Sequence, residues 1–319
     1  MEHKVGIIGL GVVGKRMLAN MTAHHRFTVV GAWDSNPEAC AETRARHPYL
    51  RIGDSAEAVI VNPDVELIYI AVPPLAHRRY ALATIAAGRA VFCEKPLGIN
   101  IGESRDLLQR VVESGRPNAV NFVYGATAAS DLLESKLREG ALGTIQGVDI
   151  RLHFATWPRL WQRSATWLST REQGGFVREV LSHFIYLVER LFGPAEIRHA
   201  ATRFPPGGEL AETHVLAELA CKGLCVTIAG SVGGAGPDQV EFTVWGSRQS
   251  YRLREWYRLT VSEGGDWADA LPPIANLAQD AYQRQLDNLA ALLDGGAHAM
   301  PDFAAALSVQ QIIEALLWT

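Results

Sequence analysis

Glu179 and His183 stand four residues apart in the segment Gly174–His183, which reads GGFVREVLSH. In a helix this spacing puts both side chains on one face, and Tyr186 continues the same stripe. A carboxylate beside an imidazole raises the basicity of the ring and fixes its orientation, so the pair could hold or move a proton. The alternative is an ordinary Glu–His pair on a helix, and the segment alone leaves both interpretations open.

Lys95 is a second residue that could move a proton. It lies in the segment Ala90–Pro96, AVFCEKP, directly after an apolar strand and next to Glu94. A lysine at the carboxyl end of a strand can be partly desolvated and tuned toward proton transfer. Hydride transfer to a ketone or imine leaves a developing anion or amine that needs a proton, which an ammonium group would supply. In isolation, the tripeptide Glu-Lys-Pro is more typical of a solvated turn, but its position in the order of the predicted strands favours the catalytic role.

Three glycines near the start of the chain have the spacing of a dinucleotide-binding turn. Residues 4–14 read KVGIIGLGVVG, an apolar strand followed by Gly9, Gly11 and Gly14. Gly9 permits the tight turn, Gly11 lets backbone N–H groups approach a pyrophosphate, and Gly14 lets the next helix pack closely. The N-terminus of that helix offers free N–H groups to the phosphates.

Asp34 follows the second predicted strand and lies 20 residues after Gly14. At that distance a carboxylate can accept hydrogen bonds from an adenosine ribose. The sequence Asp-Ser-Asn-Pro is also typical of a helix N-cap, and the two roles are compatible. A carboxylate would repel a 2′-phosphate, and no arginine follows in residues 35–37, so the sequence favours NAD over NADP.

The elements that must position these residues change in kind after residue 123. Before it, strands (about 4–9, 27–33, 50–53, 66–72, 89–93 and 118–123) alternate with helices (about 12–24, 36–47, 54–61, 75–87 and 100–114). This alternation predicts an α/β Rossmann domain over 1–123, with a doubly wound parallel sheet. Its ligand crevice lies at the carboxyl ends of the strands, where residues 9–14, 34, 72–77 and 93–96 fall.

Residues 124–319 are expected to form an α+β domain. Consecutive strand-like runs joined by short turns, between about 196 and 262, predict a large open, mostly antiparallel sheet. We expect helices at about 127–139, 177–191, 275–294 and 302–318 to cover one face, with the C-terminal helix able to pack back on the first domain.

Composition narrows the class of protein. A chain of 319 residues is long enough for two domains, and its net charge of −4 gives no broad attraction to nucleic acid or an anionic membrane. No apolar stretch approaches the roughly 20 residues that span a bilayer. The chain opens on a strand, so we expect no signal peptide. Cys40, Cys93, Cys221 and Cys225 lie among apolar neighbours and are expected to be buried thiols in a reducing cytoplasm.

The chain resembles the Gfo/Idh/MocA family of NAD(P)-dependent oxidoreductases. The resemblance rests on GIIGLGVVG at 6–14, Asp34, AVPPLAH at 71–77, VFCEKPL at 91–97, and the Gly-Gly-Phe, Glu and His of 174–183. It implies that Lys95 is the catalytic lysine beside the nicotinamide, that Glu94 helps to seat the cofactor, and that the Lys95–Pro96 peptide is cis. It also makes His183 an acid–base group or substrate anchor in the same pocket as Lys95, with Glu179 as its orienter.

The expected binding residues follow from the same resemblance. The cofactor would be held by Gly9, Gly11, Val12, Val13, Gly14, Asp34, Val72, Pro73, Leu75, His77, Glu94 and Lys95. The substrate would meet Tyr124, Trp161, Arg163, Trp167 and Tyr186. No metal is expected.

Three residues depart from the family pattern, all at the substrate end. Glu179 stands where aspartate is usual, Tyr186 stands where many members carry another aspartate, and the segment 121–127 lacks an arginine. These departures favour an unusual substrate and leave a lost activity open.

The segment 151–178 carries five arginines and three interleaved tryptophans against the single acid Glu172. The resemblance implies that the substrate-covering loop lies here, and our hypothesis is that one or two of these arginines clamp a carboxylate or phosphate of the substrate. A surface or subunit-contact loop is the alternative.

Taken together, the sequence predicts an NAD(P)-dependent oxidoreductase acting on a C–OH/C=O or C–NH/C=N centre of a small polar metabolite, anionic or sugar-derived. An NAD-dependent glycoside hydrolase and a catalytically silent nucleotide sensor are the alternatives. We expect no nucleic acid or membrane partner. The resemblance implies that residues 124–319 bind the substrate and form a homodimer or homotetramer through the C-terminal sheet.

Overall fold

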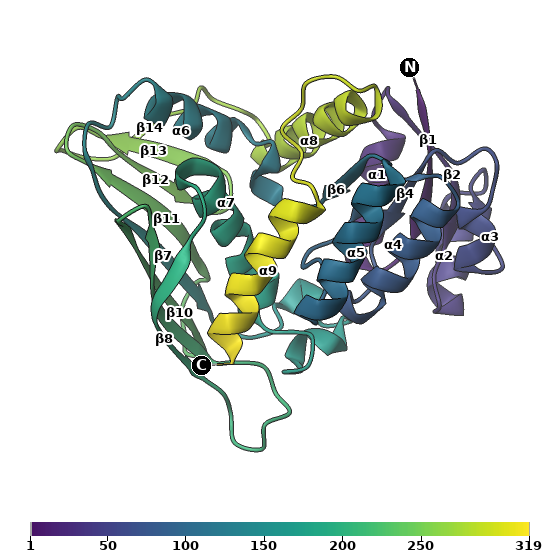
Figure 1. Ribbon diagram of the computed structural model, residues 1–319, viewed down its shortest axis with the longest axis horizontal. Helices are drawn as coiled ribbons and strands as arrows, with labels where there is room; N and C mark the ends of the chain where they lie inside the picture. Colours follow the sequence, from purple (N-terminus) through teal and green to yellow (C-terminus); the bar gives the residue numbers. More distant parts are fainter. Residues whose placement is uncertain (1, 319) are drawn as a thin grey trace. The chain divides into compact units, whose positions relative to one another are not determined.

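The computed structural model describes residues 2–318 (Figure 1). The chain divides into two compact units. The first contains the residues up to Phe122 together with Tyr282–Gln310, and the second contains Val123–Ala281 together with the residues from Gln311 onward.

The first unit is built on a six-stranded parallel sheet with the strand order β3-β2-β1-β4-β5-β6. The strands are β1 His3–Ile8, β2 Phe27–Trp33, β3 Arg51–Ile52, β4 Leu67–Ile70, β5 Ala90–Cys93 and β6 Asn118–Val120. The helices are α1 Val12–Thr22, α2 Pro37–Arg46, α3 Ala56–Ile60, α4 His77–Ala86 and α5 Ile101–Ser114. The chain reverses its direction of winding beside β1, which is flanked by β2 and β4, so the ligand crevice lies at the carboxyl end of β1.

Burial explains why these segments form a parallel sheet. All residues of β4 and β5 are buried, as expected for short apolar strands covered by helices on both faces. Figure 1 shows helices on either side of this sheet. The core also takes Leu286, Leu289 and Ala290 from α8 (Leu277–Leu293), so a distant stretch of the chain completes the first unit. The predicted Rossmann sheet is confirmed.

The second unit contains an eight-stranded sheet with the order β14-β13-β12-β11-β7-β10-β9-β8. The strands are β7 Ile145–Phe154, β8 Glu196–Arg203, β9 His214–Cys221, β10 Leu224–Val232, β11 Gln239–Gly246, β12 Ser250–Arg254, β13 Arg258–Ser262 and β14 Ala268–Asp269. β7 and β10 are parallel to each other and the remaining neighbours are antiparallel. The prediction of a mostly antiparallel sheet is confirmed.

Helices cover one face of this second sheet. They are α6 Ala128–Arg138 and α7 Ser182–Phe192, together with the last turns of α9 (Phe303–Leu317). Along β10, Val226 and Ile228 are buried whereas Cys225 and Thr227 are exposed, so alternate residues face the helices and the open side. Phe184 of α7 stacks on Phe242 of β11 at 6.2 Å between ring centroids.

Three expectations need correction. The helix expected at 275–294 does not cover the second sheet, because Leu286, Leu289 and Ala290 of α8 lie in the core of the first unit. The helix predicted at 177–191 is in fact a π-helical stretch, Val177–Leu181, that continues into α7. The four cysteines are not all buried: Cys93 and Cys221 are, Cys40 is half-buried, and Cys225 is exposed because it lies on the uncovered face of β10.

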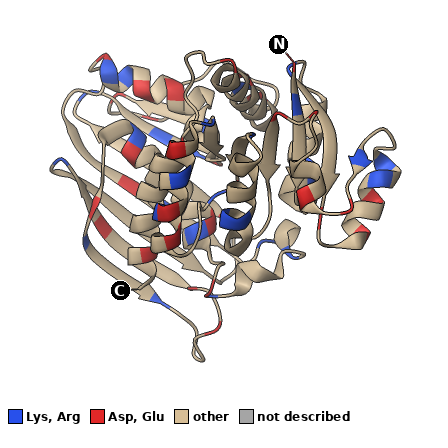
Figure 2. Ribbon diagram, turned by 45° about the vertical axis from the view of Figure 1, so that its right-hand side comes forward, with Lys and Arg blue, Asp and Glu red and all other residues tan. Residues whose placement is uncertain are grey.

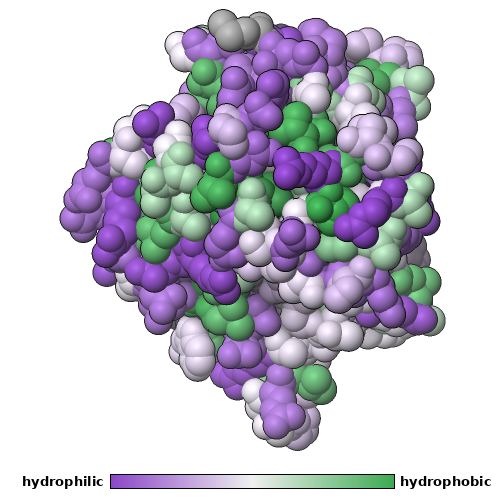
Figure 3. All heavy atoms as spheres, turned by 90° about the vertical axis from the view of Figure 1, so that its right-hand side faces the viewer, coloured by the Kyte–Doolittle hydropathy of each residue, from purple (hydrophilic) through white to green (hydrophobic). Residues whose placement is uncertain are grey.

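The surface carries charges of both signs. Figure 2 shows acidic and basic residues interspersed along the helices and strands, in agreement with the small net charge. On the face drawn in Figure 3, hydrophobic residues form small patches separated by hydrophilic ones. Among residues 2–318, none of the helices combines the length and the apolar character needed to cross a membrane.

Candidate active site

In the glycine turn after β1, two of the three glycines have no space for a side chain and the third has open space. A Cβ atom on Gly9 would lie 2.3 Å from the carbonyl oxygen of Ala71, and one on Gly14 would lie 1.9 Å from that of Gly9. A Cβ atom on Gly11, the N-cap of α1, would meet no heavy atom within 4 Å. The turn therefore leaves space above a helix N-terminus, where Val12 and Val13 begin α1, and this space fits a dinucleotide diphosphate.

Asp34 fastens this turn to the end of β2. Its Oδ2 accepts the main-chain N–H of Leu10 at 2.6 Å, and its Oδ1 accepts that of Asn36 at 2.7 Å. The N-cap of α2 is Asn36, which accepts the N–H of Glu38 at 2.9 Å, so Asp34 is not the cap. A carboxylate oxygen has two lone pairs, and each oxygen of Asp34 can still accept a ribose hydroxyl.

His77 joins the loops that follow β4 and β5. Its ring is fully buried, with one nitrogen 2.8 Å from the carbonyl oxygen of Val72 and the other 2.8 Å from that of Pro96. A neutral imidazole has a single N–H, so only one of these contacts is a donated hydrogen bond. His77 thus braces the crevice loops, while Leu75 in the 3₁₀ turn Pro74–Ala76, which follows Pro73, is exposed.

Lys95 and Glu94 follow β5 and are both buried. The Glu94 carboxylate accepts hydrogen bonds from the Tyr69 hydroxyl and the Asn121 amide, and Asn121 in turn accepts one from Gln285 of α8 at 2.7 Å. Burial, with the Glu94 charge beside it, raises the pKa of Tyr69 well above its usual value, so Tyr69 remains a donor. The expected cis peptide between Lys95 and Pro96 is present.

The anchoring of Glu94 was not predicted from sequence. The contact between Tyr69 and Glu94 could have been predicted from the sequence. Tyr69 is one residue from the end of β4, Glu94 follows the end of β5, and the carboxyl ends of parallel strands lie at the same edge of a sheet. Gln285 lies 164 residues after its partner Asn121, and nothing local to either residue indicates the contact.

In the second unit, His183 lies in the first turn of α7. Its Nδ1 accepts the main-chain N–H of Val123 at 3.2 Å. The Oε1 of Glu179 accepts the Gln162 amide at 2.9 Å. The expectation that Glu179 orients His183 stays a prediction.

Two buried contacts hold the π-helical stretch that carries Glu179. Arg178 makes a bidentate ion pair with Glu314 of α9, both distances being 2.7 Å, and donates to the carbonyl oxygens of Arg171 and Gly174. Glu212 accepts the main-chain N–H of Val177 at 2.7 Å.

Close contacts also explain the paired glycines of this segment, and Glu212 accounts for one of them. Gly175 has a φ of +97°, and a Cβ atom there would lie 2.2 Å from a Glu212 carboxylate oxygen. A Cβ atom on Gly174 would lie 2.4 Å from the main-chain oxygens of Trp167 and Leu168. Burial raises the pKa of Glu212 to about 7.

Aromatic rings surround Arg159 in this unit. Its guanidinium carbon lies 4.7 Å from the centroid of Trp161, 5.5 Å from Phe154, 5.6 Å from Trp256 and 5.7 Å from Trp157. Its Nε donates to the Gln162 side chain at 2.8 Å, and Gln162 donates to Glu179, so a polar chain links Arg159 to the predicted acid.

The predicted substrate residues lie in different surroundings. Tyr124 is buried and its ring centroid is 6.5 Å from that of His183, and Trp161 contacts Arg159. Arg163 is exposed, Trp167 is half-buried in the 3₁₀ helix Thr166–Ser169, and Tyr186 is buried in α7. Trp256, which contacts both Arg159 and His183, was missed because no motif surrounds it.

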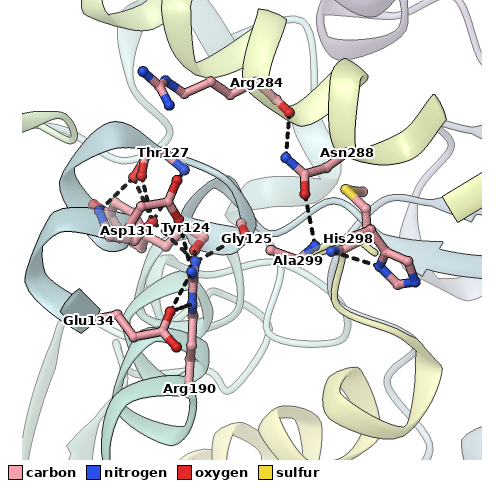
Figure 4. A network of polar contacts seen from close by, with 12 residues as sticks. Tyr124, Gly125, Thr127, Asp131, Glu134, Arg190, Arg284, Asn288, His298 and Ala299 are labelled. Carbon is pink, nitrogen blue, oxygen red and sulfur yellow. Dashed lines mark hydrogen bonds and ion pairs between the residues drawn. The ribbon is translucent and has the colours of Figure 1, made fainter. Parts of the chain in front are cut away.

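Arg190 of α7 fixes the chain next to Val123. It donates to the carbonyl oxygens of Tyr124 at 2.7 Å and Gly125 at 3.0 Å, and it pairs with Asp131 and Glu134 of α6 (Figure 4). The main-chain N–H that meets His183 is therefore held by its neighbours along the chain.

Family models and curated relatives agree with this arrangement. The model described as "Oxidoreductase family, NAD-binding Rossmann fold" matches residues 3–122, and "Oxidoreductase family, C-terminal alpha/beta domain" matches residues 134–317. Levoglucosan dehydrogenase of Pseudarthrobacter phenanthrenivorans is 30% identical over 44% of this chain and 38% of its own length. Inositol 2-dehydrogenase of Acidothermus cellulolyticus is 30% identical over 44% and 42%, respectively. The chain thus aligns with less than half the length of these two relatives.

Solved structures share the fold over the whole chain. A levoglucosan dehydrogenase in complex with NADH and levoglucosan is 21% identical, with a TM-score of 0.86 over 100% of this chain and 96% of that one. The WlbA dehydrogenase from Bordetella pertussis, in complex with NADH and UDP-GlcNAcA, is 22% identical, with a TM-score of 0.83 over 99% and 95%. With both of its domains matched, the chain belongs to the Gfo/Idh/MocA family of oxidoreductases, with an NAD-binding Rossmann domain and a C-terminal α/β domain.

Proposed function

We propose that the protein is an NAD-dependent dehydrogenase or reductase that transfers hydride to or from a C–OH/C=O centre of a small cyclic polyol or sugar derivative. The observation that carries this proposal is the buried Lys95 at the carboxyl end of β5, in the unit that also holds the open glycine cradle. The family and the named activities of its relatives, which include levoglucosan and inositol dehydrogenases, support the substrate class.

Lys95 is the proposed proton relay. When bound, the dinucleotide supplies the hydride donor or acceptor, held by the glycine turn and Asp34. A buried ammonium next to the anchored Glu94 carboxylate is positioned without large side-chain freedom, so it can exchange a proton with the substrate hydroxyl at low reorganisation cost. An amine or imine substrate would use the same relay.

His183 is the proposed substrate anchor. Its Nδ1 is engaged by the Val123 N–H, so in the neutral ring the proton is on Nε2. From there it would donate a hydrogen bond to the substrate oxygen. Glu179, linked through Gln162 to Arg159, would complete the polar side of the site.

Arg159 is the proposed partner of an anionic group on the substrate. Two other arginines of the segment are engaged elsewhere: Arg178 pairs with Glu314, and Arg171 lies 3.9 Å above the ring of Phe204. Arg159 alone of these three is linked to Glu179. A uronic or aldonic acid would fit this chemistry.

We propose further that two or more copies associate through the open face of the second sheet, where Leu216 and Trp245 are exposed. The free thiols of Cys93 and Cys221 fit a reducing, cytoplasmic location.

Turnover of a substrate panel tests the central proposal. The panel would contain cyclic polyols, uronic acids and neutral sugars, followed by absorbance of NADH, with Lys95→Met as the variant. We expect net NADH formation by the native protein and a loss of kcat of about 10² to 10⁴ in Lys95→Met. A native rate in the variant contradicts the proposal. Product formation without net NADH identifies a hydrolase, and NADH binding without any turnover identifies a sensor.

A further inference from the structure

The turn between β12 and β13 has an unusual backbone. Arg254 pairs with Arg258, which leaves Glu255, Trp256 and Tyr257 in the turn. Glu255 has a φ of +51° and Trp256 a φ of +73°, and neither is glycine. Positive φ is disfavoured for a bulky L-residue, and turns of this kind usually carry Asn, Asp or Gly there. The residue type at 256 thus opposes the local backbone preference.

The side chain of Trp256 lies between two residues of the candidate site. Its ring meets the ring of His183 edge to face, 5.7 Å between centroids and 84° between planes. The guanidinium carbon of Arg159 lies 5.6 Å from its centroid, and the ring of Phe184 lies 6.1 Å away. Trp256 as a residue is half-buried.

A merely space-filling role does not account for this combination. An apolar side chain on a relaxed turn could cover Phe184 without positive φ. Backbone strain persists where the surrounding structure determines it, and it concentrates at ligand sites. The contact with His183 places the strained residue next to the proposed substrate anchor.

We propose that Trp256 determines substrate specificity by forming an aromatic wall on which a ring-shaped polyol stacks its C–H face. The inference rests on the proposed function and deepens it. A flat indole offers a large, rigid apolar surface, and it matches the apolar face of a cyclic polyol better than a short open chain. The cation–π contact with Arg159 and the edge contact with His183 hold the indole in place.

Three variants separate stacking from packing. Trp256→Asn removes the ring, while Asn tolerates the left-handed backbone. Trp256→Tyr retains an aromatic face. Glu255→Asn relaxes the turn, leaves Trp256 intact and serves as the matched control. The probes are levoglucosan and myo-inositol as rings, with glycerol and erythritol as open chains. Each is measured for KM and kcat, and for binding by ligand-observed saturation-transfer NMR.

We expect Trp256→Asn to bind the ring compounds about tenfold more weakly, as measured by KM or by NMR affinity. The same variant should bind the open-chain compounds as the native protein does. The affinity of Trp256→Tyr for the ring compounds should stay within about threefold of that of the native protein. Glu255→Asn should bind them with native affinity, and its Tm should equal or exceed the native Tm. Equal loss for rings and open chains, no loss for rings, or no binding of either ring to the native protein each overturns the proposal. Because the NMR measurement needs no turnover, a protein that binds rings through Trp256 but forms no NADH refutes the proposed function and leaves this inference standing.

Discussion

The main-chain N–H of Val123 donates a hydrogen bond to Nδ1 of His183 over 3.2 Å. Because a main-chain N–H is a permanent donor, Nδ1 must present its lone pair, and the neutral ring carries its proton on Nε2. A proton taken up at Nδ1 would break this contact. The ring is therefore suited to donate from Nε2, and this leaves Lys95 as the proposed relay for the substrate proton.

The first prediction concerns this tautomer. In protein labelled with ¹⁵N-histidine, we expect the neutral His183 ring to show a protonated Nε2 and an unprotonated Nδ1. His183→Gln retains an amide donor near the Nε2 position, so it should keep more activity than His183→Asn, whose loss should be about 10²-fold or more. A neutral ring protonated at Nδ1, or equal losses in the two variants, contradicts this assignment.

The second prediction is that Lys95 and His183 act on the same substrate. In a double-mutant cycle of Lys95→Met and His183→Asn, we expect the effects on kcat/KM to be non-additive, with a coupling energy of about 0.5–3 kcal/mol. Arg198→Ala, a change in an exposed side chain of β8, replaces His183→Asn in the control cycle. Additive effects in the Lys95–His183 cycle would show that the two residues serve separate steps.

The third prediction tests the glycine cradle. A methyl group at Gly11 would have no heavy atom of a non-neighbouring residue within 4 Å, but it would enter the space assigned to the diphosphate. Gly11→Ala should therefore fold with native stability and bind NADH about tenfold or more weakly. Calorimetric titration and thermal unfolding measure the two properties. The control is Gly265→Ala, which also adds a methyl group to open space and should change neither. Native NADH affinity in Gly11→Ala would place the diphosphate elsewhere.

The fourth prediction is that the cofactor preference depends on Asp34. The native protein should use NADH with a higher kcat/KM than NADPH, because the carboxylate repels a 2′-phosphate. Asp34→Asn keeps an acceptor for the Leu10 N–H but removes the charge. It should therefore preserve the fold and reduce the ratio of kcat/KM for NADH to that for NADPH. Steady-state kinetics with both cofactors measure the ratio. A higher kcat/KM of the native protein with NADPH than with NADH would contradict this prediction.

The fifth prediction is a pH dependence of stability caused by Glu212. Its carboxyl pKa rises from 4.5 in the unfolded chain to about 7 in the folded one, chiefly because burial disfavours the charged form. Between these values the folded protein binds more protons than the unfolded chain, so this contribution to stability is complete below pH 4.5 and is lost as the pH rises through about 7. The loss amounts to about 3 kcal/mol.

Chemical denaturation across this pH range measures the effect. Glu212→Gln retains an oxygen that can accept the Val177 N–H but cannot ionise, so its free energy of unfolding should fall less steeply with pH. Glu218→Gln, an exposed change on β9, provides the comparison. Parallel slopes for the native protein and Glu212→Gln would assign the pH dependence to other groups.

The amino-acid sequence by itself determined the local features of this protein. Local rules account for the spacing of Gly9, Gly11 and Gly14 and for the apolar strands before Asp34 and Glu94. Backbone sterics and short-range periodicity can be recognised within about 30 residues of sequence. They predicted the Rossmann sheet, the cofactor turn and the family, and the structure and the family models confirm the fold and the family.

Tertiary structure alone decided which partners these residues have. Gln285 donates a hydrogen bond to Asn121, and Glu314 pairs with Arg178. The Val123 N–H determines which nitrogen of the neutral His183 ring is protonated, and Trp256 packs against that ring. The partners in each contact are 60 residues or more apart in the sequence. Burial makes such contacts necessary, because a buried polar group must find a hydrogen-bond partner wherever the fold supplies one. No local pattern in the sequence records which distant residue that will be.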